Sequence, residues 1–312
     1  MNPIVQLQGV SKKYGDFAAV DGMNLQVAKG EVFGFLGPNG AGKSTTLRMI
    51  LSLIKPTTGS ISLFGLDLHQ HRNAILGRIG CIVEKPDFYL YLSGLDNLRL
   101  FGRMSHTRQL NERIETVLHL VGLKGREKDR VKTYSHGMKQ RLGLAQALLH
   151  EPELIILDEP STGLDPQGII ELRNLILHLK NDLGKTVILS SHILSEIEMI
   201  ADSMVIIHRG KAVVQGKVSE LLSHEDLQVD VQVDDPAAAE TALHESRLGH
   251  LILERIPGAL KLRCAKSDIP QVARLLTDKG IAIFGLQATR SLEDYFLRIT
   301  ASPEKADILA FK

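Results

Sequence analysis

Residues 37–45 read GPNGAGKST and fit the phosphate-loop pattern G-x-x-x-x-G-K-S/T. The apolar run 32–36 before them predicts a strand, and residues 46–51 predict a helix that follows directly. Glycines let successive backbone N–H groups turn toward an anion, and the helix directs its positive end at the same point. A glycine-rich turn could match by chance, but all fixed positions and both flanks agree. The stretch therefore predicts a nucleoside triphosphate site.

Within this phosphate loop, Lys43 is expected to reach the β- and γ-phosphates and the Ser44 hydroxyl to bind Mg²⁺. The full set expected to contact the nucleotide here is Gly37, Pro38, Asn39, Gly40, Ala41, Gly42, Lys43, Ser44 and Thr45.

Composition places the chain in a broad class. Its 312 residues suggest about two domains, and an apolar share of 44% is that of a globular protein. A net charge of +1 gives no basic excess for nucleic acid. No apolar run approaches a membrane span, the N-terminus does not resemble a secretory signal, and Cys81 and Cys264 lie far apart. We expect a cytoplasmic protein that does not bind nucleic acid.

Two acidic residues close a second apolar run. Residues 154–157 read LIIL, typical of a parallel strand buried on both faces, and Asp158 and Glu159 follow. Ligands of open α/β sheets bind at this end of the strands. Asp158 is expected to hold Mg²⁺ through water, and Glu159 to orient or deprotonate an attacking water. The alternative is a solvated acidic pair, which the phosphate loop disfavours.

Two further residues are candidates for contact with the nucleotide. His192 follows residues 186–191, which predict a buried strand with a polar end, and at the end of a core strand we expect it to donate to the γ-phosphate. Tyr14 lies on a predicted polar turn, residues 11–15, and could stack on adenine or be an ordinary surface tyrosine. The residues alone leave both readings of Tyr14 open.

A largely helical insert is expected over about residues 88–150, between two segments of the site. Near its end, Ser135 and Gly137 precede a predicted helix, with Ser135 as its N-cap. Backbone N–H groups at such a helix start could meet a phosphate, although many caps look similar.

These motifs together carry a resemblance. In order, GPNGAGKST, YSHGMKQRL, LIILDEP, STGLD and SSH resemble those of the nucleotide-binding domain of an ABC (ATP-binding cassette) transporter, over about residues 1–220. The resemblance implies an α/β P-loop NTPase fold with a helical subdomain. It also implies adenine stacking by Tyr14, a catalytic base at Glu159, a switch histidine at His192, and ATP with Mg²⁺ as ligands.

The same resemblance implies a dimer. Ser135 and Gly137 belong to the signature loop, residues 134–138, which in this family caps the γ-phosphate bound by a second subunit. Asp165 lies in the loop that connects the two sites. One chain would therefore carry both halves of a composite site, which ATP closes and hydrolysis opens.

The chain departs from the family pattern at two places. The signature is commonly LSGGQ, and here His136 and Met138 replace a glycine and a glutamine. Glu84 stands where a glutamine usually contacts Mg²⁺ and reports to the membrane domain, so it is a candidate both for the metal and for catalysis. Glutamate there, with GMKQRLGLA and GLDPQGI, resembles ABC-2 exporters of bacitracin- and lantibiotic-type peptides. We expect Glu84 to keep the coupling role.

A second domain is predicted over residues 221–312. Its pattern of strand, helix, two strands, helix and strand predicts a small α+β, ferredoxin-like unit. The segment SLED-x-F at residues 291–296 resembles the closing helix of ABC-2-type ATPases. We expect a regulatory or dimer-supporting role, with small-molecule sensing as the weaker alternative.

The sequence thus indicates the ATP-hydrolysing subunit of an exporter. It would work as a dimer with separate integral membrane permease subunits, on the inner face of the cell membrane. The rival is a soluble ABC ATPase of translation or DNA maintenance, disfavoured by a single motif set without sustained heptads or a basic patch. A non-enzymatic scaffold is disfavoured because the four residues of the chemistry are all present, namely Lys43, Asp158, Glu159 and His192.

Overall fold

The computed structural model describes residues 3–83, 87–222, 227–290 and 296. The chain forms two compact units, Met1–Lys217 and Val218–Lys312. Within the described ranges, no helix is both long enough and apolar enough to cross a membrane.

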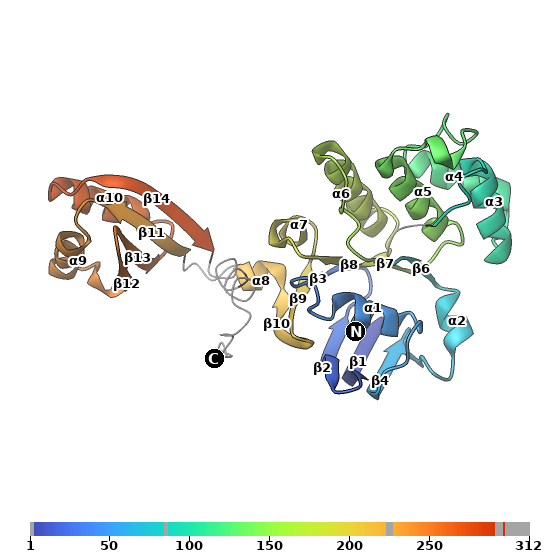
Figure 1. The fold of residues 1–312 in the computed structure, drawn as a ribbon, viewed down its shortest axis with the longest axis horizontal. Helices are drawn as coiled ribbons and strands as arrows, with labels where there is room; N and C mark the ends of the chain where they lie inside the picture. Colours follow the sequence, from blue (N-terminus) through green and yellow to red (C-terminus); the bar gives the residue numbers. More distant parts are fainter. Residues whose placement is uncertain (1–2, 84–86, 223–226, 291–295, 297–312) are drawn as a thin grey trace. The chain divides into compact units, whose positions relative to one another are not determined.

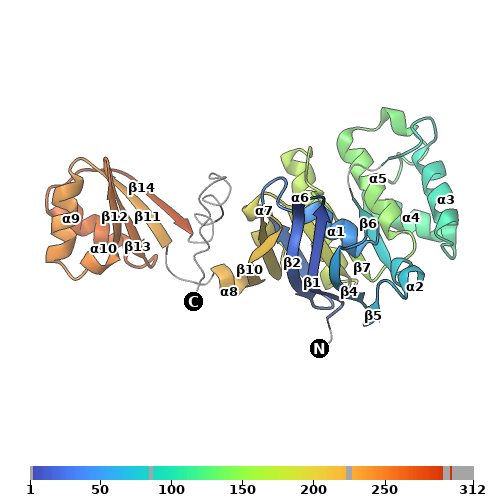
Figure 2. The same ribbon diagram turned by 60° about the horizontal axis from the view of Figure 1, so that its bottom comes forward.

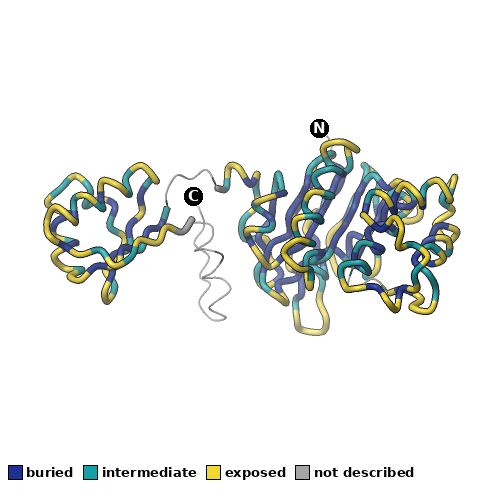
Figure 3. Tube along the Cα trace, turned by 90° about the horizontal axis from the view of Figure 1, so that it is seen from above, coloured by how far each residue is buried: buried dark blue, intermediate teal, exposed yellow. Residues whose placement is uncertain are grey.

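A six-stranded sheet runs through the first unit in the order β10-β9-β3-β8-β7-β6 (Figure 1). All neighbours pair in parallel except β10, which pairs antiparallel with β9 at the edge. The strands are β3 (Val32–Leu36), β6 (Ile79–Ile82), β7 (Leu154–Leu157), β8 (Thr186–Ser191), β9 (Ser203–His208) and β10 (Lys211–Lys217). Every residue of β3, β7 and β8 is buried, as the apolar runs of β3 and β7 and the apolar middle of β8 lead one to expect, and the tube of Figure 3 is dark along this sheet.

A second, antiparallel sheet has the order β2-β1-β4-β5. Its strands are β1 (Val5–Tyr14), β2 (Phe17–Val27), β4 (Thr58–Leu63) and β5 (Leu66–Asp67). The turn predicted over residues 11–15 was wrong for most of its length. Lys12, Lys13 and Tyr14 pair with β2, so that cross-strand pairing extends β1 through Tyr14.

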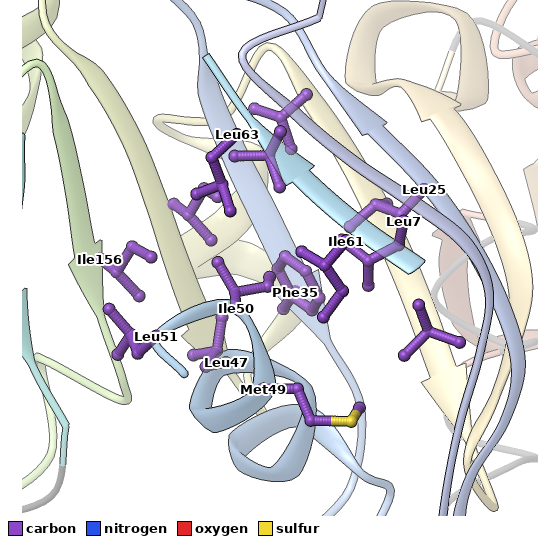
Figure 4. Close-up of a cluster of buried hydrophobic side chains, with 14 of the residues drawn as sticks. Leu7, Leu25, Phe35, Leu47, Met49, Ile50, Leu51, Ile61, Leu63 and Ile156 are labelled. Atoms are coloured by element: carbon purple, nitrogen blue, oxygen red, sulfur yellow. The ribbon is translucent and has the colours of Figure 1, made fainter. Parts of the chain in front are cut away.

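The core of the first unit lies around α1 (Lys43–Ile50), between the two sheets (Figures 2 and 4). Leu47 and Ile50 of this helix belong to one buried cluster with Phe35 of β3, Ile61 of β4 and Ile156 of β7. Each such side chain contributes roughly 1.5–3 kcal/mol when fully buried. This packing fixes the helix, and with it the loop that precedes it.

Most helices of the expected insert gather at one side of the first unit (Figure 1). They are α3 (Gly94–Met104), α4 (Leu110–Leu120), the short 3₁₀ helix η1 (Val131–Thr133) and α5 (His136–Leu148). The remaining helices of this unit are α2 (Arg72–Leu76), α6 (Pro166–Asn181) and α7 (Leu194–Glu198). Helix α5 packs against β6, which connects this group to the six-stranded sheet.

The second unit has the β-α-β-β-α-β order expected of a ferredoxin-like fold. Its antiparallel sheet has the order β12-β13-β11-β14. After α8 (Val218–Leu222) come β11 (Leu227–Val233), α9 (Pro236–Glu245), η2 (Gly249–Leu251), β12 (Ile252–Ile256), β13 (Ala259–Cys264), α10 (Ile269–Asp278) and β14 (Ile283–Arg290). A separate buried cluster, including Val231, Leu260 and Leu276, forms its core. Residues 291–295 of the expected closing helix lie outside the described residues.

Candidate nucleotide-binding site

The phosphate loop connects the end of β3 to the start of α1. Gly42 caps the helix with a left-handed backbone (φ 107°), and a β-carbon there would lie 2.6 Å from the Ala19 carbonyl oxygen. At Gly37 a β-carbon would lie 2.3 Å from the Ile207 carbonyl oxygen. Only glycine fits at these two positions. The backbone of β9, at Ile207, and of β2, at Ala19, therefore packs directly against the loop.

Lys43 is nearly buried, with 4% of its side chain exposed. Its Nζ donates to the carbonyl oxygens of Gly37 at 2.6 Å and Pro38 at 3.3 Å, both in the loop itself. It also lies 3.2 Å from Oε1 of Glu159, which follows β7. Lys43 thus connects the phosphate loop to Glu159 at the carboxyl end of β7.

Glu159 lies between Lys43 and His192. His192 Nδ1 is 3.2 Å from Glu159 Oε2, and Glu159 itself has a left-handed backbone (φ 46°). Burial alone would raise the pKa of the Glu159 carboxyl, but Lys43 and then His192 outweigh it, so this pKa lies below its ordinary value. The carboxylate is therefore ionised at neutral pH and is held by two cationic or hydrogen-bonding neighbours.

Asp158 is positioned by a serine from the next strand. Ser190 Oγ donates to Asp158 Oδ1 at 2.5 Å and accepts from the Glu159 amide at 2.8 Å. One hydroxyl thus fixes both acidic residues at the end of β7. Ser44, in the first turn of α1, is half-buried.

The chemistry of this donor set suits Mg²⁺, which prefers oxygen ligands. Asp158 offers a carboxylate and Ser44 a hydroxyl. No three His, Cys, Asp or Glu side chains among the described residues are grouped so as to hold a metal by themselves. A magnesium ion held by one or two side chains and by substrate phosphates fits such a site.

Three other predicted site residues lie together in a second part of the first unit. Ser135, Gly137 and Asp165 line one hollow of about 760 Å³ between α5 and α6, and none of the described phosphate-loop residues lines it. Ser135 Oγ caps α5 by accepting from the Met138 amide, and Asp165 Oδ1 caps α6 by accepting from the Gly168 amide. Apart from Tyr14 and Glu84, the predicted site residues therefore fall into two groups, one at or beside the phosphate loop and one at this hollow.

Comparison with known proteins gives the family. The family described as ABC transporter matches residues 20–162. An uncharacterized ABC transporter ATP-binding protein of Bacillus subtilis (strain 168), YhcH, is 41% identical over 98% of both chains. The chain belongs to the ABC transporter ATP-binding protein family.

Two further similarities support this assignment. The bacitracin transport ATP-binding protein BcrA of Bacillus licheniformis is 40% identical over 96% of this chain and 98% of that protein. A dimeric ATP-binding cassette, MJ0796, in a post-hydrolysis state bound to ADP and Pi, superimposes with a TM-score of 0.63 and 25% identity over 69% of this chain and 98% of that one. As a member of this family, the chain is an ATP-binding cassette that hydrolyses ATP.

Two predicted site residues remain, Tyr14 and Glu84. Tyr14 ends β1, and half of the residue is exposed, with Lys12 Nζ 5.1 Å from the ring centroid. The exposed ring leaves stacking on a base sterically open. Glu84 falls outside the described residues, so its predicted contacts with the metal remain predictions.

Several polar residues of the cassette were missed at the sequence level. Ser190 fixes Asp158 and Glu159, and Glu196 of α7 accepts from both Ser161 (2.8 Å) and Ser191 (2.6 Å). Ser190 and Ser191, at the polar end of β8, are 0% and 2% exposed. Buried hydroxyls of this kind need partners, which was the available signal for their role.

Proposed function

We propose that this cassette is the ATP-hydrolysing subunit of an exporter that acts through separate membrane subunits. The observation that carries the proposal is the cluster of Lys43, Glu159 and His192 beside the phosphate loop, with Ser135, Gly137 and Asp165 at a separate hollow of the same unit. The first group supplies a phosphate-binding cation and a base. The second group has no nucleotide-binding loop of its own among the described residues and suits a nucleotide presented by another copy.

Binding of ATP would change the surroundings of Glu159. The phosphates compete with Glu159 for the Lys43 ammonium, and release of that partner weakens the effect that lowers the pKa of the carboxyl. Glu159 then becomes a stronger base toward an attacking water, and His192 can donate to the γ-phosphate. Tyr14 stacks on the adenine, and the backbone N–H groups of residues 37–45 surround the phosphates.

Ser44 and Asp158 are the residues proposed to hold Mg²⁺, with Glu84 as a further candidate. A bound Mg²⁺ neutralises charge on the phosphates. The Ser190 hydroxyl holds Asp158 in place for this contact.

We further propose a dimer in which Ser135 and Gly137 of each copy cap the γ-phosphate bound by the other, with Asp165 beside them. The solved MJ0796 cassette is dimeric, which supports this arrangement. A homodimer is the simplest form, since one chain contributes both groups of residues. The second unit is proposed to regulate or support this dimer.

The proposed role in export across the membrane rests on the similarity to transport proteins. They include a bacitracin transport protein and, at 35% identity over 96% of this chain, a Nod factor export protein of Cupriavidus metallidurans. We propose that this cassette likewise acts in export, bound through permease subunits to the inner face of the cell membrane. Glu84 is proposed to report hydrolysis to them, and Glu84→Gln should then alter ATPase activity or transport.

Co-purification tests this proposal against the rival ATPase of translation or DNA maintenance. The full chain, tagged and recovered from detergent-solubilised membranes of its native cells, should bring a polytopic membrane protein with it. A matched Gly37→Val chain, in which the new side chain meets the Ile207 carbonyl, controls for capture by misfolded protein. Recovery with ribosomes or DNA instead would exclude the exporter and favour the rival.

A further inference from the structure

His136 begins α5 and reaches out of the signature loop to another segment of the same chain. Its Nε2 lies 3.1 Å from the carbonyl oxygen of Thr162, in the turn of residues 160–165 between β7 and α6. A carbonyl oxygen only accepts, so Nε2 carries the proton and donates. The ring also packs closely on Gly163 (φ 78°), because a β-carbon there would lie 2.9 Å from Nε2.

Helix α5 holds this turn at further points. Gln140, 8% exposed, donates from Nε2 to the Pro160 carbonyl oxygen at 3.1 Å. Leu164 lies beside Gly137, since a β-carbon on Gly137 would be in ordinary van der Waals contact with Leu164 Cδ2, at 3.7 Å. His136 is the exposed, outermost of these contacts and lines the same hollow as Ser135 and Asp165.

The turn that His136 contacts also leads to the base. Thr162 donates its amide to the Glu159 carbonyl oxygen at 3.2 Å, and its hydroxyl lies 3.4 Å from Glu159 Oε2. One residue therefore accepts from His136 and touches Glu159. A glycine at position 136 would leave the Thr162 carbonyl without this donor.

We propose that His136 is a positioning residue that fixes the signature loop to the 160–165 turn through its contact with Thr162. This inference rests on the proposed dimer, in which the loop and the turn face the partner's nucleotide. The contact keeps Ser135 and Asp165 at a set separation for that nucleotide, and it transmits displacement of the signature loop to the chain's own Glu159. Because His136 does not touch the phosphate loop, it acts on turnover and not on the binding of ATP by its own chain.

Steady-state ATPase assays of the purified full chain test this with two substitutions. His136→Leu keeps a side chain of comparable bulk but has no donor, and His136→Gln places an N–H at similar reach. We expect the leucine variant to lose about three- to tenfold in kcat, the worth of one hydrogen bond, with KM for ATP nearly unchanged. The glutamine variant should keep most of the parental kcat. Parental turnover with leucine overturns the proposal, as does a glutamine variant as slow as the leucine one.

A second experiment uses Gly163→Ala and depends on neither His136→Leu nor His136→Gln. Gly163→Ala puts a β-carbon against the imidazole, and its backbone strain at positive φ is the same whatever residue stands at 136. The loss in kcat should therefore be several-fold greater in the parental chain than in a His136→Ala chain, as double-mutant cycles detect for residues in contact. Equal losses in both backgrounds would show that the contact has no effect on turnover.

Ser135→Ala separates this inference from the proposed dimer. If Ser135→Ala lowers kcat and His136→Leu does not, only the role of His136 is lost. If Ser135→Ala also turns over at the parental rate, the composite site itself is wrong. Thermal unfolding of each variant shows whether a lower kcat reflects a less stable chain.

Discussion

Single residues at the phosphate loop are held by contacts with one another. Lys43, nearly buried, is shared between loop carbonyls and Glu159, and His192 contacts the same carboxylate. A buried ammonium without such partners would be costly, so the contacts stabilise Lys43 in the loop. The same contacts hold the proposed base in its ionised form.

Glu159→Gln is expected to bind ATP but to hydrolyse it at least about a hundredfold more slowly, because a general base contributes 10²–10⁴-fold to rate. Phosphate release measures turnover, and gel filtration with ATP measures the dimer, which should accumulate. Glu112→Gln, at an exposed position of α4, serves as the matched control and should keep the parental rate. Parental turnover in Glu159→Gln would remove Glu159 as the base.

The lowered pKa of Glu159 predicts that the free energy of unfolding of the nucleotide-free chain depends on pH. This pKa lies below the ordinary value of 4.5, so the carboxylate stabilises the folded chain at neutral pH. That contribution is lost as pH falls through the lowered pKa. The free energy of unfolding of the parental chain should exceed that of Glu159→Gln at pH 7, and the difference should shrink below about pH 4.5.

Tyrosine fluorescence during urea unfolding measures this difference. The chain has no Trp, and of its 5 Tyr residues four lie in the first unit: Tyr14, Tyr89, Tyr91 and Tyr134. A difference that stayed constant from pH 7 into the acid range would contradict the assigned ion pair.

At two helix N-termini, the residue that caps the helix also has a proposed function. Ser135 caps α5 and Asp165 caps α6, each through its side-chain oxygen. Ser93 caps α3 in the same manner, accepting from the Asp96 amide at 3.0 Å, at a helix with no proposed phosphate contact. Comparing Ser135 with Ser93 allows the effect on stability to be separated from the effect on turnover.

Ser135→Ala and Ser93→Ala should each cost about 1 kcal/mol of stability through the lost cap. Only Ser135→Ala should also lower kcat, by about tenfold or more, because it removes a donor to the partner's γ-phosphate. Urea unfolding and steady-state ATPase assays on both variants check this. Equal effects of the two substitutions on kcat would reduce Ser135 to a helix cap.

At the scale of the whole molecule, the two units have separate buried cores. Leu63 belongs to the core of the first unit and Leu260 to that of the second, and both are fully buried. No described residue belongs to both clusters. Each core therefore accounts for the stability of its own unit.

Leu260→Ala should lower protection against hydrogen exchange across residues 227–290 by about 2–5 kcal/mol, and leave protection of the first unit unchanged. Leu63→Ala should do the reverse. Exchange measured by mass spectrometry on the full chain resolves the two units. Loss of protection in both units from either substitution would show that they unfold together.

The sequence by itself determined the phosphate loop, the acidic pair and the βαββαβ order of the second unit. These features depend on local chemistry: glycine's freedom at Gly42, the continuous apolar run before Asp158, and the alternation of strand residues in 227–233. The family motifs extended this reading to the signature loop. Strand limits were less secure, as Tyr14 shows, because pairing with a distant strand decides where a strand ends.

Only the tertiary structure decided which side chains meet. Ser190 holds Asp158 from a strand far along the chain, Glu159 lies between Lys43 and His192, and His136 contacts Thr162. Each contact joins segments brought together by the order of a parallel sheet and by the packing of α5 against it. Hydrogen bonds and ion pairs of this kind depend on distances of about 3 Å, which residue spacing along the sequence does not specify.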